Sequence, residues 1–105
     1  MMNLEIIKNA LLSVSENVFH FNAPPNQKAE YIIWAEDGVN GFKANNRRDE
    51  SAITGTIDLF TKNEKSDLVV EIERALNETP AAWYLNSIQH EQETGIIHYE
   101  WVFEV

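Results

Sequence analysis

Two histidines near the carboxyl end of the chain are the residues best placed to do chemistry. His90 and His98 flank a predicted turn. The acidic residues close to them in sequence are Glu91, Glu93 and Glu100. Imidazole and carboxylate groups bind zinc and act as general acids and bases, so one hypothesis is a metal or acid–base cluster across this hairpin. The other hypothesis is that these are solvated strand residues, which the alternation of His98 with an apolar stripe favours.

Other catalytic patterns do not occur in the sequence. The chain has no cysteine, which excludes disulfides, thiolate metal sites and cysteine nucleophiles. It has no phosphate-binding loop, nucleophile elbow or paired-histidine zinc motif. Glu71 and Glu73 lie two positions apart on a predicted helix, about 200° around its axis, so their carboxylates do not converge. We therefore predict that the protein is not an enzyme and uses no catalytic residue, metal or cofactor.

A cluster of basic residues stands out in an otherwise acidic chain. Lys43, Arg47 and Arg48 are three of the eight basic residues, and all three lie in a glycine- and asparagine-containing segment, residues 37–51, that predicts a long loop. One interpretation is a solvated loop. The other is that the loop contacts an acidic surface of a neighbouring copy, because charge complementarity steers and registers association.

Length and charge limit what the chain can be. Its 105 residues predict one domain, residues 1–105, with 44 % hydrophobic and 24 % charged residues as in ordinary globular proteins. A formal net charge of -9 argues against general binding to nucleic acid or anionic membranes, since both are themselves anionic. No apolar run approaches the roughly 18 residues of a membrane span, so we expect a soluble protein without membrane contact.

The last eleven residues carry the strongest strand signal. Apolar and aromatic side chains recur at every second position, which in a strand places them all on one face. Glu100 and Glu104 fall on the opposite face, where we expect them either to be solvated or to meet a neighbour's basic loop at Arg47 and Arg48. We also expect this terminal strand to be exposed. The stripe consists of Ile97, Tyr99, Trp101, Phe103 and Val105.

The rest of the chain supplies elements to cover that stripe. Apolar residues spaced three and four apart predict helices over residues 3–18 and 63–77. Residues 28–36, 52–61 and 81–91 predict strands, the first of them buried on both faces. Between the first helix and the first strand, two prolines predict a turn. Trp34, Trp83 and Trp101 are predicted to lie in the core rather than to form a ligand platform.

The predicted fold class is α+β. The order α-β-β-α-β-β gives a four-stranded antiparallel or mixed sheet with both helices on one face. The register of the last hairpin stays open. If the loop of the last hairpin has an even number of residues, Tyr84 and Ile88 lie on the face of the apolar stripe. If the number is odd, Trp83 and Leu85 lie there instead.

Four segments carry a resemblance to a known family. They are Tyr31-Ile32-Ile33-Trp34, the run from Gly55 to Lys62 (GTIDLFTK), the helix end Glu73-Arg74-Ala75-Leu76, and the run from Glu93 to Trp101 (ETGIIHYEW). Together they look like the small tail-terminator or tail-completion (head–tail joining) proteins of long-tailed bacteriophages and prophages. The similarity runs over nearly the whole chain.

The resemblance implies a non-enzymatic virion protein. It implies α+β domains that assemble as homo-oligomeric rings, typically hexameric, which cap the tail tube and join it to the head. The implied partners are other copies, the tail-tube protein and the head–tail connector proteins, and the implied location is the head–tail junction after assembly in the host cytoplasm. An alternative is a monomeric acidic binding or inhibitor module that engages a basic partner. A small hydrolase or metal enzyme using His90 and His98 is a third hypothesis.

Overall fold

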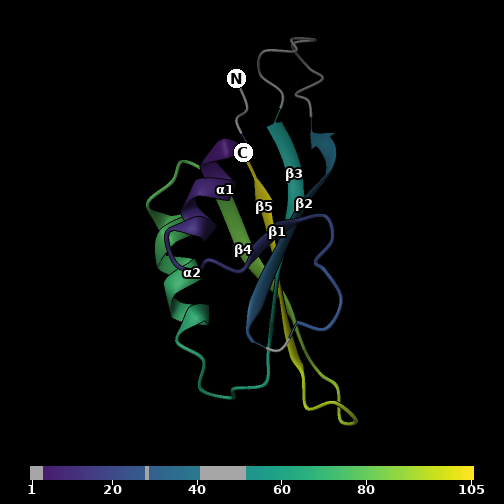
Figure 1. The fold of residues 1–105 in the computed structure, drawn as a ribbon. Helices are drawn as coiled ribbons and strands as arrows, with labels where there is room; N and C mark the ends of the chain where they lie inside the picture. The colour runs from purple at the N-terminus through teal and green to yellow at the C-terminus, as the bar shows by residue number, and fades with distance from the viewer. Residues whose placement is uncertain (1–3, 28, 41–51) are drawn as a thin grey trace.

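Two helices cover one side of a five-stranded mixed sheet in the computed structural model, which describes residues 4–27, 29–40 and 52–105 (Figure 1). This arrangement confirms the predicted α+β class with both helices on one face. The helices are α1 (Glu5–Leu12) and α2 (Leu68–Asn77). The strands are β1 (Val18–His20), β2 (Tyr31–Asn40), β3 (Ala52–Thr61), β4 (Ala82–His90) and β5 (Ile97–Glu104).

The sheet contains one strand more than the sequence predicted. Its strand order is β1-β2-β3-β5-β4, with β1 parallel to β2 and every other neighbour antiparallel. The three residues of β1 are too few to show a period of two, so pairing with β2 and not local pattern makes this strand. The amide of Ile32 donates to the carbonyl of Asn17 at 2.8 Å, and the amide of Phe21 donates to that of Trp34 at 2.9 Å.

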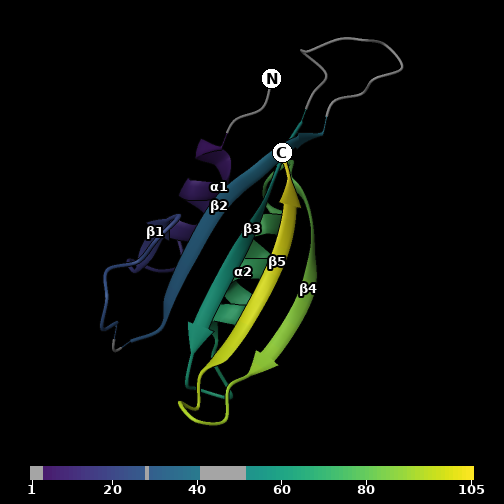
Figure 2. The same cartoon turned by 90° about the vertical axis from the view of Figure 1, so that its right-hand side faces the viewer.

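The terminal strand is not exposed, contrary to expectation. β5 lies inside the sheet, with β3 on one side and β4 on the other (Figure 2). The strands at the two ends of the sheet are β1 and β4. Contacts through a free sheet edge must therefore use these two strands and not β5.

The predicted apolar stripe of β5 is confirmed as the centre of the core. Trp101 and Phe103 are fully buried, Ile97 is 4 % exposed and Tyr99 is half-buried. The Trp101 indole N–H donates to Glu73 Oε2 of α2 at 2.9 Å. Glu73 is half-buried at this contact between helix and sheet. The remaining core residues are Ile7, Leu11, Ile32, Trp34, Ile57, Leu59, Ile72 and Leu76.

Both helices are shorter than their apolar periodicity predicted. α1 ends at Leu12 instead of residue 18, because the chain turns after it and Val18 pairs with Ile32 in the sheet. α2 begins at Leu68 instead of residue 63. Before it, Asn63 Oδ1 accepts the amide of Lys65 at 2.9 Å, so polar side chains fold this segment into turns.

The second strand is longer than predicted and is less completely buried. β2 continues to Asn40, which takes the start of the predicted 37–51 loop into the sheet, and residues 41–51 lie outside the described residues. Ile32 and Trp34 are buried on the helix side, whereas Tyr31 and Ile33 on the other side are only half-buried. Burial on both faces is therefore wrong, because both helices lie on one side of the sheet.

An irregularity in β4 resolves the open register. The pairing with β5 shifts between Leu85 and Ser87, so both alternatives occur, one on each side of the shift. Because directly opposed residues share a face, Trp83, Leu85 and Ile88 all project toward the helix side, and Tyr84 projects away from it. The pairs are Trp83 with Phe103, Leu85 with Trp101, Ile88 with Tyr99 and Tyr84 with Val102.

Replacing Gly55 by alanine should destabilise the fold. An added Cβ at this β3 position would lie 2.3 Å from the Ala35 carbonyl oxygen and 2.5 Å from Phe103 Cζ, so backbone or core must shift. We expect a loss of about 3 kcal/mol in the free energy of unfolding, measured by urea denaturation. Gly38→Ala is the control, since its Cβ would meet only Thr54 Oγ1 at 3.3 Å. Equal losses for the two variants would contradict this packing.

Candidate functional site

The side of the sheet opposite the helices carries a set of polar, aromatic and aliphatic side chains that we call the open face. They project from β2, β3 and β5, and they are half-buried by one another. Strand pairing places them side by side, because residues opposed in β3 and β5 point to the same side. The open face consists of Tyr31, Ile33, Thr56, Asp58, Phe60, His98, Glu100 and Val102.

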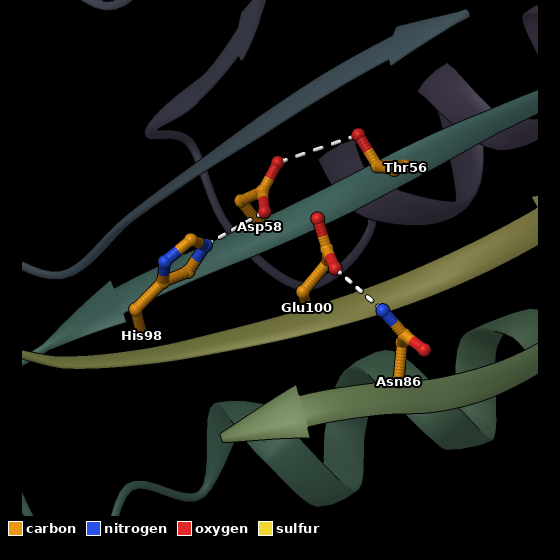
Figure 3. A network of polar contacts seen from close by, with 5 residues as sticks. All are labelled: Thr56, Asp58, Asn86, His98 and Glu100. Atoms are coloured by element: carbon orange, nitrogen blue, oxygen red, sulfur yellow. Dashed lines mark hydrogen bonds and ion pairs between the residues drawn. The ribbon is translucent and has the colours of Figure 1, made fainter. Parts of the chain in front are cut away.

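A network of polar contacts centres on Asp58 of β3 (Figure 3). His98 Nε2 lies 2.7 Å from Asp58 Oδ1, and Thr56 Oγ1 donates to Asp58 Oδ2 at 3.5 Å. Glu100 is directly opposite Asp58 on β5. Its own Oε1 accepts a hydrogen bond of 2.8 Å from Asn86 Nδ2 of β4. The network thus ties the three neighbouring strands β3, β5 and β4 together.

Burial governs the charge of Asp58. Its side chain is only 17 % exposed, and loss of hydration raises the pKa of its carboxyl group above the ordinary 3.8. The hydrogen bond from His98 acts in the opposite direction, and the nearby charge of Glu100 adds to the increase. Asp58 therefore holds a proton more readily in the folded chain than in the unfolded chain.

Aromatic rings line one end of the open face. The ring centroids of Tyr31 and Phe60 are 4.9 Å apart, those of Phe60 and His98 are 4.4 Å apart, and both pairs are stacked. A hollow of about 480 Å³ lies beside Tyr31 and Phe60, bounded also by Lys62 and Ile96. A second hollow of about 340 Å³ shares Tyr31, Phe60 and Ile96. This end of the sheet therefore has an aromatic surface against which other side chains can pack.

The hypothesis of a metal or acid–base cluster around His90 and His98 finds no support in the described residues. His98 pairs with Asp58, while Glu91 accepts from Thr94 Oγ1 within the turn at 2.6 Å. Within residues 4–27, 29–40 and 52–105, no three His, Asp or Glu side chains are grouped so that they can hold a metal ion. His90 is exposed and lines the second hollow.

The predicted interface residues are only partly placed. Glu100 and Glu104 lie opposite the apolar stripe of β5, as expected, and both are half-buried. Lys43, Arg47 and Arg48 lie outside the described residues. A contact between that basic cluster and the two glutamates therefore stays a prediction.

Sequence reasoning missed two histidine–carboxylate pairs. Besides the pair of His98 and Asp58, His20 Nε2 lies 2.6 Å from Glu36 Oε1, and this hydrogen bond lowers the pKa of Glu36. The His20 ring stacks on Trp34 with centroids 4.0 Å apart. Each pair joins two strands, so only the register of those strands brings it together. The one available signal was an aspartate within an otherwise apolar and threonine-rich strand.

Comparison with known proteins leaves the function to be argued from the residues. No known family model matches the chain, and no curated protein matches it. In the part of the chain that the structure describes, neither helix has the length and apolar character needed to cross a membrane.

Replacing Asp58 by asparagine should change how stability depends on pH. The folded state binds the Asp58 proton more tightly than the unfolded state, so this group lowers wild-type stability as pH rises from 3.8 through its raised pKa. Asparagine does not titrate. The free energy of unfolding of Asp58→Asn minus that of the wild type should therefore increase as pH rises over that interval. Urea denaturation between about pH 3.5 and 6 measures this difference.

Glu36→Gln is the control, with the opposite sign. The lowered pKa of Glu36 stabilises the wild type above the ordinary 4.5, and this contribution is lost as pH falls through the folded value. The free energy of unfolding of Glu36→Gln minus that of the wild type should thus decrease as pH rises. The same direction in both variants would contradict the burial argument for Asp58.

Proposed function

We propose that this chain is a structural protein of a long-tailed bacteriophage or prophage. In this role it is a ring-forming tail terminator, or head–tail joining component, that caps the tail tube and connects it to the head. The observation that carries the proposal is the one-sided sheet. Its helices cover one face, and β1 and β4 are the end strands of the sheet (Figure 1).

A ring subunit needs two different surfaces that bind each other, because a closed ring is built from head-to-tail contacts. It also needs a surface for the tube beneath it. The sheet offers its two end strands, β1 and β4, for the first purpose. The open face with the stacked Tyr31 and Phe60 serves the second, since aromatic side chains are favoured at protein interfaces. The resemblance in element order and strand sequence supports the same role.

Electron microscopy of the purified chain with tail tubes tests the proposal. The tubes come from the phage or prophage that encodes the chain. We expect a concentration-dependent oligomer that forms rings at tube ends, and a weaker tendency to form rings when Arg47 and Arg48 are changed to Glu. A chain that stays monomeric at all concentrations and salts, alone and with tail tubes, would contradict the proposal.

The same preparation distinguishes the alternative function. A monomeric inhibitor or binding module would capture a cationic protein and show no affinity for tail or head components. That result would replace the assembly role, because an acidic surface that engages a basic partner requires no contact between copies.

A further inference from the structure

Exposed apolar side chains gather at the two edges of the sheet. Of the seven large hydrophobic residues that are exposed in the described part of the chain, three lie on β4 and Phe21 directly follows β1. Leu12 ends α1 and lines a hollow together with Val18 of β1. A sixth, Val39, lies on β2 beyond the residues that pair with β1, and the seventh, Val70, lies on α2. The first five of these are Leu12, Phe21, Tyr84, Leu85 and Ile88.

The two edge strands contain no Asp, Glu, Lys or Arg. The two longest stretches without Asp, Glu, Lys or Arg are residues 79–90 and 17–27, and they contain β4 and β1 respectively. The chain carries a net charge of -9, so two copies repel each other over most of their surfaces. The two edge strands carry none of this charge, so contact between them does not oppose like charges.

Charged residues disfavour the addition of a further strand along the rest of the β2 edge, whereas β4 has no such residues. Glu36 and Asp37 stand on β2 just beyond its pairing with β1, next to a register shift, and charges and bulges commonly block strand addition. β4 has nine residues with neither a charge nor a proline, although it has its own register shift. A strand that joins β4 can complete the outward-facing backbone hydrogen bonds of this edge strand.

The two edges also differ in shape. Beside β1, under α1, lies a hollow of about 320 Å³. Its apolar walls are Leu4, Leu12, Val18 and Trp34, and its polar walls are Glu5, Lys8 and His20. On β4, Leu85 and Ile88 project toward the helix side and are 36 % and 50 % exposed. If the sheet continues from one copy into the next with its helices on the same side, these two side chains meet the hollow.

We propose that copies of this chain join edge to edge, with β4 of one copy beside β1 of the next and with Leu85 and Ile88 in the hollow beneath α1. The choice of a second copy as the occupant rests on the proposed ring-forming function. Because the two surfaces differ, the junction is heterologous, and its repetition gives a closed ring when the rotation between copies closes.

Lysine substitutions at the two edges test the junction. Ile88→Lys alters the β4 surface and Leu12→Lys alters the β1 surface, both at exposed positions, so circular dichroism should show folded variants. Sedimentation equilibrium should give each variant alone a dissociation constant at least about tenfold above wild type. Val70→Lys is the matched control: the residue is 57 % exposed on α2, and this variant should assemble as wild type does.

Mixing the two edge variants gives the decisive result. An equimolar mixture should form dimers and nothing larger, since Ile88→Lys retains its β1 surface and Leu12→Lys retains its β4 surface. Wild-type assembly by Leu12→Lys would overturn the proposal in favour of β4 pairing with itself. Equal loss in Val70→Lys would overturn it in favour of a general charge effect.

Different results would overturn the edge-to-edge junction and the proposed phage function. Rings that cap tail tubes but tolerate both edge variants would overturn the junction and leave the function in place. Edge-dependent oligomers that do not bind tail or head components would overturn the phage function and leave the junction in place.

Discussion

The burial of Trp101 beneath α2 is the interaction on which the rest of the structure depends. Its side chain is completely buried on β5, and an indole N–H left unpaired there would cost about 1–3 kcal/mol. Glu73 accepts that hydrogen bond at 2.9 Å and so fixes α2 against the sheet. Ile72 and Leu76 of the same helix complete the contact with the core. One apolar stripe thus decides which side of the sheet the helices occupy.

The open face and the exposed sheet ends both result from the placement of the two helices on one side of the sheet. The opposite side keeps polar groups that are half-buried by their neighbours, which is why Asp58 is held close to His98 and has a raised pKa. The ends of the sheet keep apolar side chains that the described residues leave partly exposed, with Ile88 50 % exposed on β4. These exposed apolar side chains at the two ends of the sheet are the basis of the proposed assembly role.

The spacing of apolar residues predicted those helices and strands in which a regular period continues over several residues. The β5 stripe and the limits of β3 follow from a period of two, and the apolar faces of both helices follow from a period of 3.6. Features made by contact between distant segments left no such signal: the three-residue β1, the inward placement of Glu73, and the pairing of Asp58 with His98. The register shift beside Asn86 belongs to the same class, because it depends on how β4 meets β5.

β4 is the edge strand that we propose a second copy completes, and amide hydrogen exchange reports directly on that pairing. In dilute solution the amides of β4 should exchange faster than those of β5, which has a strand on both sides. At concentrations where copies assemble, exchange along β4 should slow in the wild type but not in Ile88→Lys. Unchanged exchange along β4 on assembly, with new protection on the outer surface of α2, would contradict the account.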